Sequence, residues 1–95
     1  MLDQAKMIMK MKKLQKQLAK EIIEVEAGDG AVTVKITGEQ KIKSIEIDPD
    51  SVDLDDIGQL EKWLEMAVKD AITQSQKVAA EKMRPVMGGL GNLGL

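Results

Sequence analysis

The segment IEVEAGDGAVTVKITG, residues 23–38, determines the fold of this chain. Apolar residues alternate with polar residues on both sides of Gly28-Asp29-Gly30, and a period of two is typical of half-buried strands. The glycines of the central triplet supply the positive backbone φ angles that a tight turn needs. The segment therefore predicts two antiparallel strands, residues 23–27 and 32–37, that are joined by a hairpin turn.

A third strand is expected over residues 41–48, where the apolar positions are Ile42, Ile45 and Ile47. Their spacing departs once from strict alternation. A β-bulge near Lys43 and Ser44 would return all three isoleucines to one face of the sheet. A sheet of three strands has two open edges, which proteins usually cover or pair with a partner.

Helices are predicted on both sides of these strands. Over residues 2–23 apolar side chains recur at steps of three or four, a helical period; they are Met7, Met11, Leu14, Leu18 and Ile22. A second, longer helix is expected from about residue 57 to 83. The sequence thus predicts an α+β fold: a single αβββα domain over residues 1–83 with a three-stranded antiparallel sheet, followed by a flexible Gly-rich tail over residues 84–95.

The composition favours a homodimer and argues against an enzyme. The 95 residues include no Phe, no Tyr and one Trp, so the core of one chain is small. Trp63 is predicted to anchor that core or an interface. Cysteine and histidine are absent, which removes thiol nucleophiles, imidazole bases and the usual transition-metal ligands. We expect no catalytic residue, no cofactor and no metal site. We also expect no signal peptide and no membrane span, and therefore a cytoplasmic location.

Two other segments were considered as binding sites. Gly28-Asp29-Gly30 lies between two strands, whereas a phosphate-binding loop lies between a strand and a helix. The acidic run of residues 46–56 lacks the central glycine and terminal glutamate of a calcium-binding loop. A hairpin turn and the charges of a helix start explain the two segments better.

Charge is distributed very unevenly along the chain. The net charge is −2, yet residues 1–20 carry +5 and residues 44–70 carry −7. The lysines of the first helix occupy a broad arc that is centred nearly opposite its apolar stripe, and further basic residues occur near the end of the second helix. The candidate DNA-binding residues are Lys6, Lys10, Lys12, Lys13, Lys16, Lys20, Lys77, Lys82 and Arg84.

A lysine-rich helix face has three possible roles: binding nucleic acid, association with a membrane surface, or solvation alone. Lysine acts on a phosphate as a point charge and does not form the bidentate base contacts of arginine. Any binding to DNA should therefore be directed at the backbone, with little sequence preference.

The chain resembles the YbaB/EbfC family of small bacterial nucleoid-associated proteins. The resemblance rests on the Lys-, Met- and Gln-rich first helix, the strand pair around Gly-Asp-Gly, the stretch GEQKIKSIEIDP at residues 38–49, the Ala-rich second helix and the GGLG at residues 88–91. Ile47-Asp48-Pro49 is its most specific element. The second helix matches no DNA-reading motif, and its first half is acidic.

The resemblance implies a homodimer in which the strands of both chains form a joint sheet and the helices project as tweezer-like arms that hold double-stranded DNA. It also implies a location in the nucleoid, where the protein would organise DNA or modulate expression. Family members are often encoded beside recombination and replication genes. The alternative function is therefore a module that binds recombination or replication proteins without contacting DNA.

Overall fold

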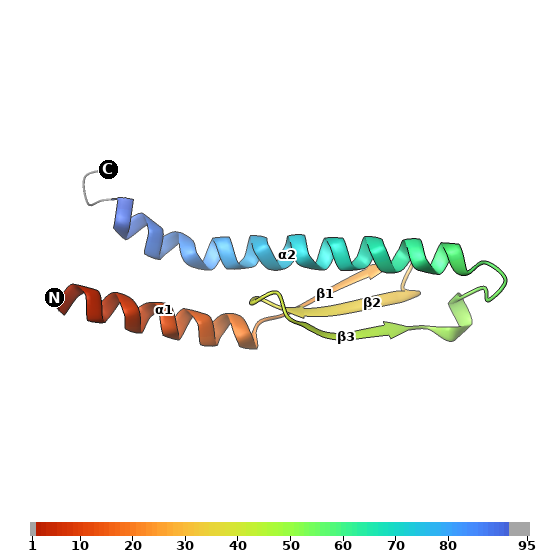
Figure 1. Cartoon of the computed structure of the whole chain (residues 1–95), viewed down its shortest axis with the longest axis horizontal. Coiled ribbons are helices and arrows are strands. Elements are labelled where there is room, and N and C mark those ends of the chain that lie inside the picture. The colour runs from red at the N-terminus through yellow and green to blue at the C-terminus, as the bar shows by residue number, and fades with distance from the viewer. Residues whose placement is uncertain (1, 92–95) are drawn as a thin grey trace.

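The structure is a computed structural model that describes the backbone of residues 2–91 and the side chains of residues 4–85. Helix α1 (Leu2–Lys20) is followed by strands β1 (Ile22–Ala27), β2 (Val32–Thr37) and β3 (Ile42–Ile47), the short 3-10 helix η1 (Pro49–Ser51) and helix α2 (Ile57–Gly91). The strands form one antiparallel sheet in the order β1-β2-β3. Helix α2 lies along this sheet and α1 extends past its end (Figure 1). The predicted αβββα order and the α+β class are confirmed.

The hairpin between β1 and β2 has the predicted turn. Gly28, Asp29 and Gly30 have φ angles of 64°, 53° and 89°, a conformation that L side chains rarely adopt. Val25 pairs with Val34 across the hairpin. Directly paired residues share a face of the sheet, so this register places the apolar residues of the two strands on one side.

The predicted bulge in β3 is also confirmed. Lys35 pairs with Ser44 and Ile36 pairs with Ile42, which leaves Lys43 as the extra residue. The bulge corrects the phase of the strand. Its three isoleucines consequently lie on the same face as the apolar residues of β2.

The core lies between this face and α2. Val32, Val34 and Ile36 are fully buried against Ala67 and Ala71, which recur at a step of four on α2. Alanines at these positions allow the helix backbone to approach the sheet closely. Each of the three β2 side chains contributes about 1.5–3 kcal/mol by leaving water.

Trp63 completes the core, as predicted for an anchor. Its ring packs over the hairpin turn, where a Cβ atom on Gly28 would lie 2.5 Å from Trp63 Cδ2. Trp63 is half-buried and packs against the core cluster. Gly28 therefore serves two purposes, the turn conformation and the space for the ring.

Two predicted boundaries differ in the structure. Ile22 belongs to β1 and is 52% exposed, so it does not extend the apolar stripe of α1. The helix ends at Lys20 because the Gly38 N–H binds the Leu18 and Glu21 carbonyls at 2.9 and 3.1 Å and turns the chain toward the sheet.

Helix α2 continues to Gly91, past the boundary predicted at residue 84. Pro85 lies inside the helix, and the helix bends in its last turns (Figure 1). An internal proline removes one helical hydrogen bond and usually bends the helix without ending it at once. Residues 92–95 of the predicted tail lie outside the described residues.

The chain is much more extended than a compact monomer of its size. Its radius of gyration is 18.2 Å and its extents are 62 × 24 × 15 Å, whereas a compact domain of this length has a radius of about 12 Å. Its accessible surface is 7182 Å², against about 5,400 Å² for a compact monomer of this mass. Much of the surface is therefore available to a partner.

The packing of Trp63 on Gly28 yields a prediction about stability. Gly28→Ala should lower the free energy of unfolding by about 2–4 kcal/mol, because the left-handed φ strains an alanine and the new methyl group collides with the ring. Gly30→Ala is the matched control, since its φ is also positive but the nearest side-chain atom is 3.9 Å away. It should cost only about 1–2 kcal/mol. Urea unfolding of both variants measures the difference, and equal losses would contradict the packing.

Candidate nucleic-acid interface

Helix α1 is attached to the rest of the fold at one junction. The buried Ser75 of α2 donates a hydrogen bond from Oγ to the Thr37 carbonyl, at 2.7 Å. The next residue, Gly38, donates its N–H to the Leu18 carbonyl of α1 at 2.9 Å. Helix α2, the turn after β2 and α1 therefore meet at this point, which sets the position of α1.

The buried side chains of α1 determine which way its lysines face. Leu14 and Leu18 are 8% and 7% exposed and form the inward side of the helix. Met7 is half-buried and Met11 is 41% exposed, so the predicted apolar stripe is fully buried only near the junction. Before Leu14, none of the described residues 4–13 is buried. Most of α1 is an arm that projects beyond the sheet.

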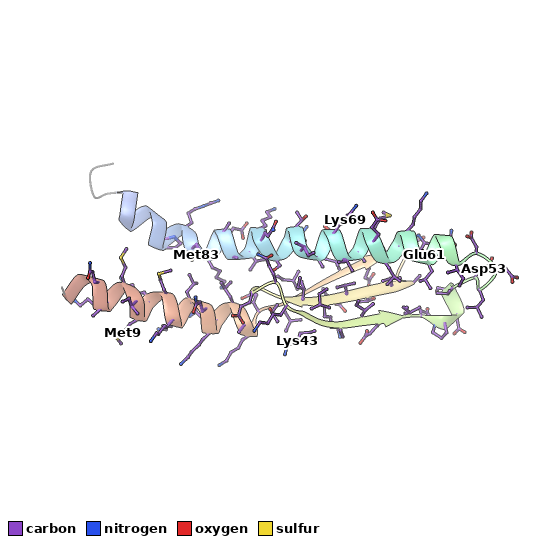
Figure 2. The ribbon with its side chains drawn as sticks, in the orientation of Figure 1. Met9, Lys43, Asp53, Glu61, Lys69 and Met83 are labelled. Atoms are coloured by element: carbon purple, nitrogen blue, oxygen red, sulfur yellow. The ribbon has the colours of Figure 1, made fainter. Side chains whose placement is uncertain are left out.

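Most of the lysines of α1 occupy the outer side of this arm. All six are exposed; they are Lys6, Lys10, Lys12, Lys13, Lys16 and Lys20, which we call the lysine face. At 100° per residue Lys12, Lys13, Lys16 and Lys20 lie on the side opposite Leu14 and Leu18, and thus away from α2. Lys6 lies at the flank of the helix, and Lys10, one turn before Leu14, lies closer to the inward side. Met9, which is 70% exposed, lies among them (Figure 2).

The basic residues of α2 do not all join this face. Lys82 lies two helical turns beyond Ser75 on the inward side, and its Nζ is 3.6 Å from Glu21 Oε2. Lys77 and Arg84 are exposed, and they lie about 200° and 180° around the helix from Ser75. The end of α2 runs beside α1 (Figure 1), yet Lys77 and Arg84 project from the side of α2 that faces away from α1. The nine predicted residues thus form three groups. Six are the lysines of α1, one is Lys82 in its ion pair with Glu21, and two are the exposed Lys77 and Arg84.

The lysine face has few acidic neighbours; one is Glu39, which lines a hollow together with Lys12 and Lys16. Among the described side chains, the ion pairs within 4 Å are Lys35–Glu46, Lys69–Glu65 and Lys82–Glu21, and none includes a lysine of α1. The carboxylates are concentrated at the other end of the molecule, where Figure 2 labels Asp53 and Glu61. There the hydrogen bond and the charge of Lys69 hold the pKa of Glu65 below its ordinary value. The basic arm and the acidic end are separated along the 62 Å axis.

The surface around the arm does not resemble a catalytic or cofactor site. A shallow, open hollow of about 280 Å³ lies between α1 and the turn after β2, lined by Lys12, Gln15, Lys16, Ala19 and Glu39. Within the described residues, no three acidic side chains are grouped so that they could hold a metal ion. Nor is any helix in that part of the chain long and apolar enough to cross a bilayer.

Two features of this surface were missed by the sequence analysis. The isoleucines Ile42, Ile45 and Ile47 are 45%, 46% and 43% exposed, because α2 packs over β1 and β2 and leaves β3 uncovered. The position of Lys82 in an ion pair was not predicted either. A step of seven from Ser75 could have indicated that Lys82 faces inward, but only once Ser75 was known to be buried.

The fold and the arm define a class of protein: a small αβββα protein whose projecting helix presents an exposed cationic face. Residues 1–90 match the YbaB/EbfC DNA-binding family, and the chain belongs to that family. It is a family of nucleoid-associated, DNA-binding proteins and not of enzymes.

Relatives and a solved structure agree with this assignment. A nucleoid-associated protein of Chloroflexus aurantiacus is 45% identical over 83 residues, which cover 87% of this chain and 83% of the relative. One from Syntrophobacter fumaroxidans is 38% identical, covering 90% of this chain and 78% of the relative. The crystal structure of an uncharacterized protein from Helicobacter pylori matches with a TM-score of 0.71 over 90% of this chain and 86% of that one. Its 20% identity supports the fold alone.

The junction at Gly38 yields a prediction about the arm. An alanine Cβ at this position would lie 2.8 Å from Leu18 Cδ2 and 3.0 Å from the Leu18 carbonyl oxygen. Gly38→Ala should therefore loosen α1 and cost about 1–3 kcal/mol of stability. Trypsin should then cleave after the lysines of α1 faster than in the parent protein.

Gly58→Ala is the control, because it lies in the first turn of α2 and only Asp56 Oδ1 is nearby, at 3.8 Å. This change should be neutral or stabilise the protein by up to about 1 kcal/mol. Equal protease resistance of α1 in the two variants would contradict the role of the junction.

Proposed function

We propose that this protein binds double-stranded DNA through contacts between the lysine face of α1 and backbone phosphates, with little sequence specificity, and that it helps to organise the nucleoid. The single observation that carries the proposal is the exposed lysine face on a projecting helix, whose lysines form no ion pair with any side chain that the structure describes. Membership in a DNA-binding family supports it. Of the nine candidate residues, we assign the main role to the six lysines of α1 and a lesser one to Lys77 and Arg84.

The chemistry of the face supports backbone contact over base reading. Lysines follow one another along α1 at steps of three and four, so several ammonium groups reach a polyanion from one side. Arginine, which forms bidentate contacts with guanine, is absent from α1, whereas glutamine, which can read adenine, occurs at Gln4, Gln15 and Gln17. The binding should depend on counterion release and therefore on salt concentration.

We further propose that the protein is a homodimer that pairs through β3. Asp48 N–H donates to the Ala31 carbonyl at 2.9 Å. Because inward and outward groups alternate in an antiparallel ladder, the backbone groups of Ile45 and Ile47 then point to the open edge. The isoleucine side chains beside that edge are also uncovered. A second copy would cover both the edge and these side chains.

The charges of β3 favour an antiparallel pairing of the two copies. Lys41 and Lys43 lie at the beginning of the strand, and Glu46 and Asp48 lie at its end. Antiparallel pairing brings the basic half of one strand beside the acidic half of the other, whereas parallel pairing would align like charges. A symmetric dimer with a two-fold axis through the sheet has this arrangement.

A salt titration tests the DNA-binding proposal. The logarithm of the affinity for a fluorescent duplex should fall linearly with the logarithm of salt concentration, with a slope of roughly −4.5 per arm if five lysines reach phosphates. Lys13→Glu with Lys16→Glu should abolish binding at physiological salt. The matched control is Lys62→Glu with Lys69→Glu, which changes the net charge equally at the sheet end of α2 and should retain most of the affinity.

Equal losses in the two double variants would refute the assignment of the lysine face. If the parent protein binds no duplex at any salt concentration, the alternative role as a protein-binding module remains. The exposed Ile8 and Met9 of the arm, 54% and 70% accessible, would then be candidate contacts.

Light scattering tests the dimer. The parent protein should have twice the chain mass of 10.4 kDa at micromolar concentration. Ile45→Lys should shift it toward the monomer, because two ammonium groups would be brought together beside the paired edges. Met66→Lys changes an equally apolar side chain, 61% exposed on α2, and should leave the mass unchanged. A dimeric Ile45→Lys variant would place the interface elsewhere.

A further inference from the structure

We propose, on the basis of the DNA-binding function proposed above, that Glu39 competes with DNA phosphate for Lys12 and Lys16 and thereby limits the affinity of the lysine face. Glu39 lies on the turn after β2, outside α1. The fold holds its acidic side chain against the basic surface of the arm.

The place where these side chains meet is a shallow hollow of about 280 Å³ between α1 and the turn after β2. Lys12, Gln15, Lys16 and Ala19 line it from the helix, and Glu39 lines it from the turn. Residues four apart on a helix lie one above the other, with Cβ atoms about 6 Å apart. Both lysines can therefore extend their ammonium groups over the same hollow, opposite a single carboxylate.

Hydrogen bonds of the turn fix the backbone of Glu39 at this place. Thr37 is buried, and its Oγ1 accepts the N–H of Glu39 at 3.2 Å and the N–H of Lys41 at 3.3 Å. Gly38, the residue before Glu39, donates its N–H to the Leu18 carbonyl of α1 at 2.9 Å. The backbone of Glu39 is thus tied to α1 through its neighbour, and only rotation of the side chain moves the carboxylate relative to the lysines.

The carboxylate acts on the two lysines without closing an ion pair with them. Glu39 is exposed, and the ion pairs within 4 Å among the described side chains do not include it. Residues that line one hollow of about 280 Å³ lie within about a Debye length of one another, about 10 Å in 0.1 M salt. Lys41 lies on the same turn but does not line the hollow. Glu39 is therefore the acidic group that lowers the positive potential there.

A phosphate that approaches Lys12 or Lys16 meets this negative charge. Carboxylate and phosphate oxygens accept the same charge-assisted hydrogen bonds from an ammonium group, so the two anions compete for the same donors. The other lysines are less affected. Lys6 lies about 9 Å further along the helix axis than Lys12, and Lys13 lies about 60° around the helix from Lys16. Neither of them lines the hollow.

A charge-neutral variant tests the effect of Glu39 on affinity. Glu39→Gln should bind a fluorescent duplex about three- to fivefold more tightly at low salt, the upper part of the range for one exposed charge pair. The turn should persist, because its hydrogen bond uses the N–H of Glu39 and not the carboxylate. Glu61→Gln is the matched control, since it makes the same change in net charge at an exposed position of α2. Its affinity should change less than twofold.

A double-mutant cycle tests whether Glu39 acts through Lys12 and Lys16. In a protein with Lys12→Gln and Lys16→Gln, the gain from Glu39→Gln should fall below twofold. In the matched background, Lys6→Gln with Lys13→Gln, the full gain should remain. Equal gains in both backgrounds would show that Glu39 acts only through the net charge and would overturn the inference.

Two further outcomes separate this inference from the proposed function. If the parent protein binds duplex and Glu39→Gln binds it equally or more weakly, the inference alone is overturned. If the parent protein binds no duplex at any salt concentration, the proposed function is overturned and the role of Glu39 with it.

Discussion

The close packing of α2 on β2 is the constraint on which the rest of the structure depends. Ala67 and Ala71 let the helix approach the sheet, and Ser75, one turn further on, binds the Thr37 carbonyl at 2.7 Å. Gly38, the residue after Thr37, donates its N–H to the Leu18 carbonyl at 2.9 Å. The position of α1, and with it the lysine face, is therefore set by a short series of contacts that begins in the core.

The separation of charge along the molecule matters more than its net charge. A polyanion responds to charges within about a Debye length, and the acidic end lies much further than that from the outer part of the arm. The overall charge of −2 is therefore compatible with a basic binding surface. The exposed isoleucines of β3 are the surface that we propose for a second copy.

Local patterns predicted most of the fold. The alternation around Gly28 and Gly30 identified the hairpin, and the spacing of Ile42 and Ile45 identified the bulge. Both features depend only on residues that are close together in the sequence. The end of α1 depends on a hydrogen bond from the distant Gly38, so its position could not be predicted from the helix itself. The candidate site was likewise predictable only in part. The lysine face is a property of one helix and could be predicted, but the ion pair of Lys82 and the exposure of β3 depend on how α2 crosses the sheet and could not.

The lysine face of α1 is the surface that we propose meets DNA. The most direct measurement is a two-dimensional NMR titration of the isotope-labelled protein with a short duplex. Amide shifts should concentrate in residues 6–20, with smaller shifts near Lys77 and Arg84 and none at Glu24 and Glu26. Shifts concentrated on the sheet or at the acidic end, with α1 unchanged, would contradict it.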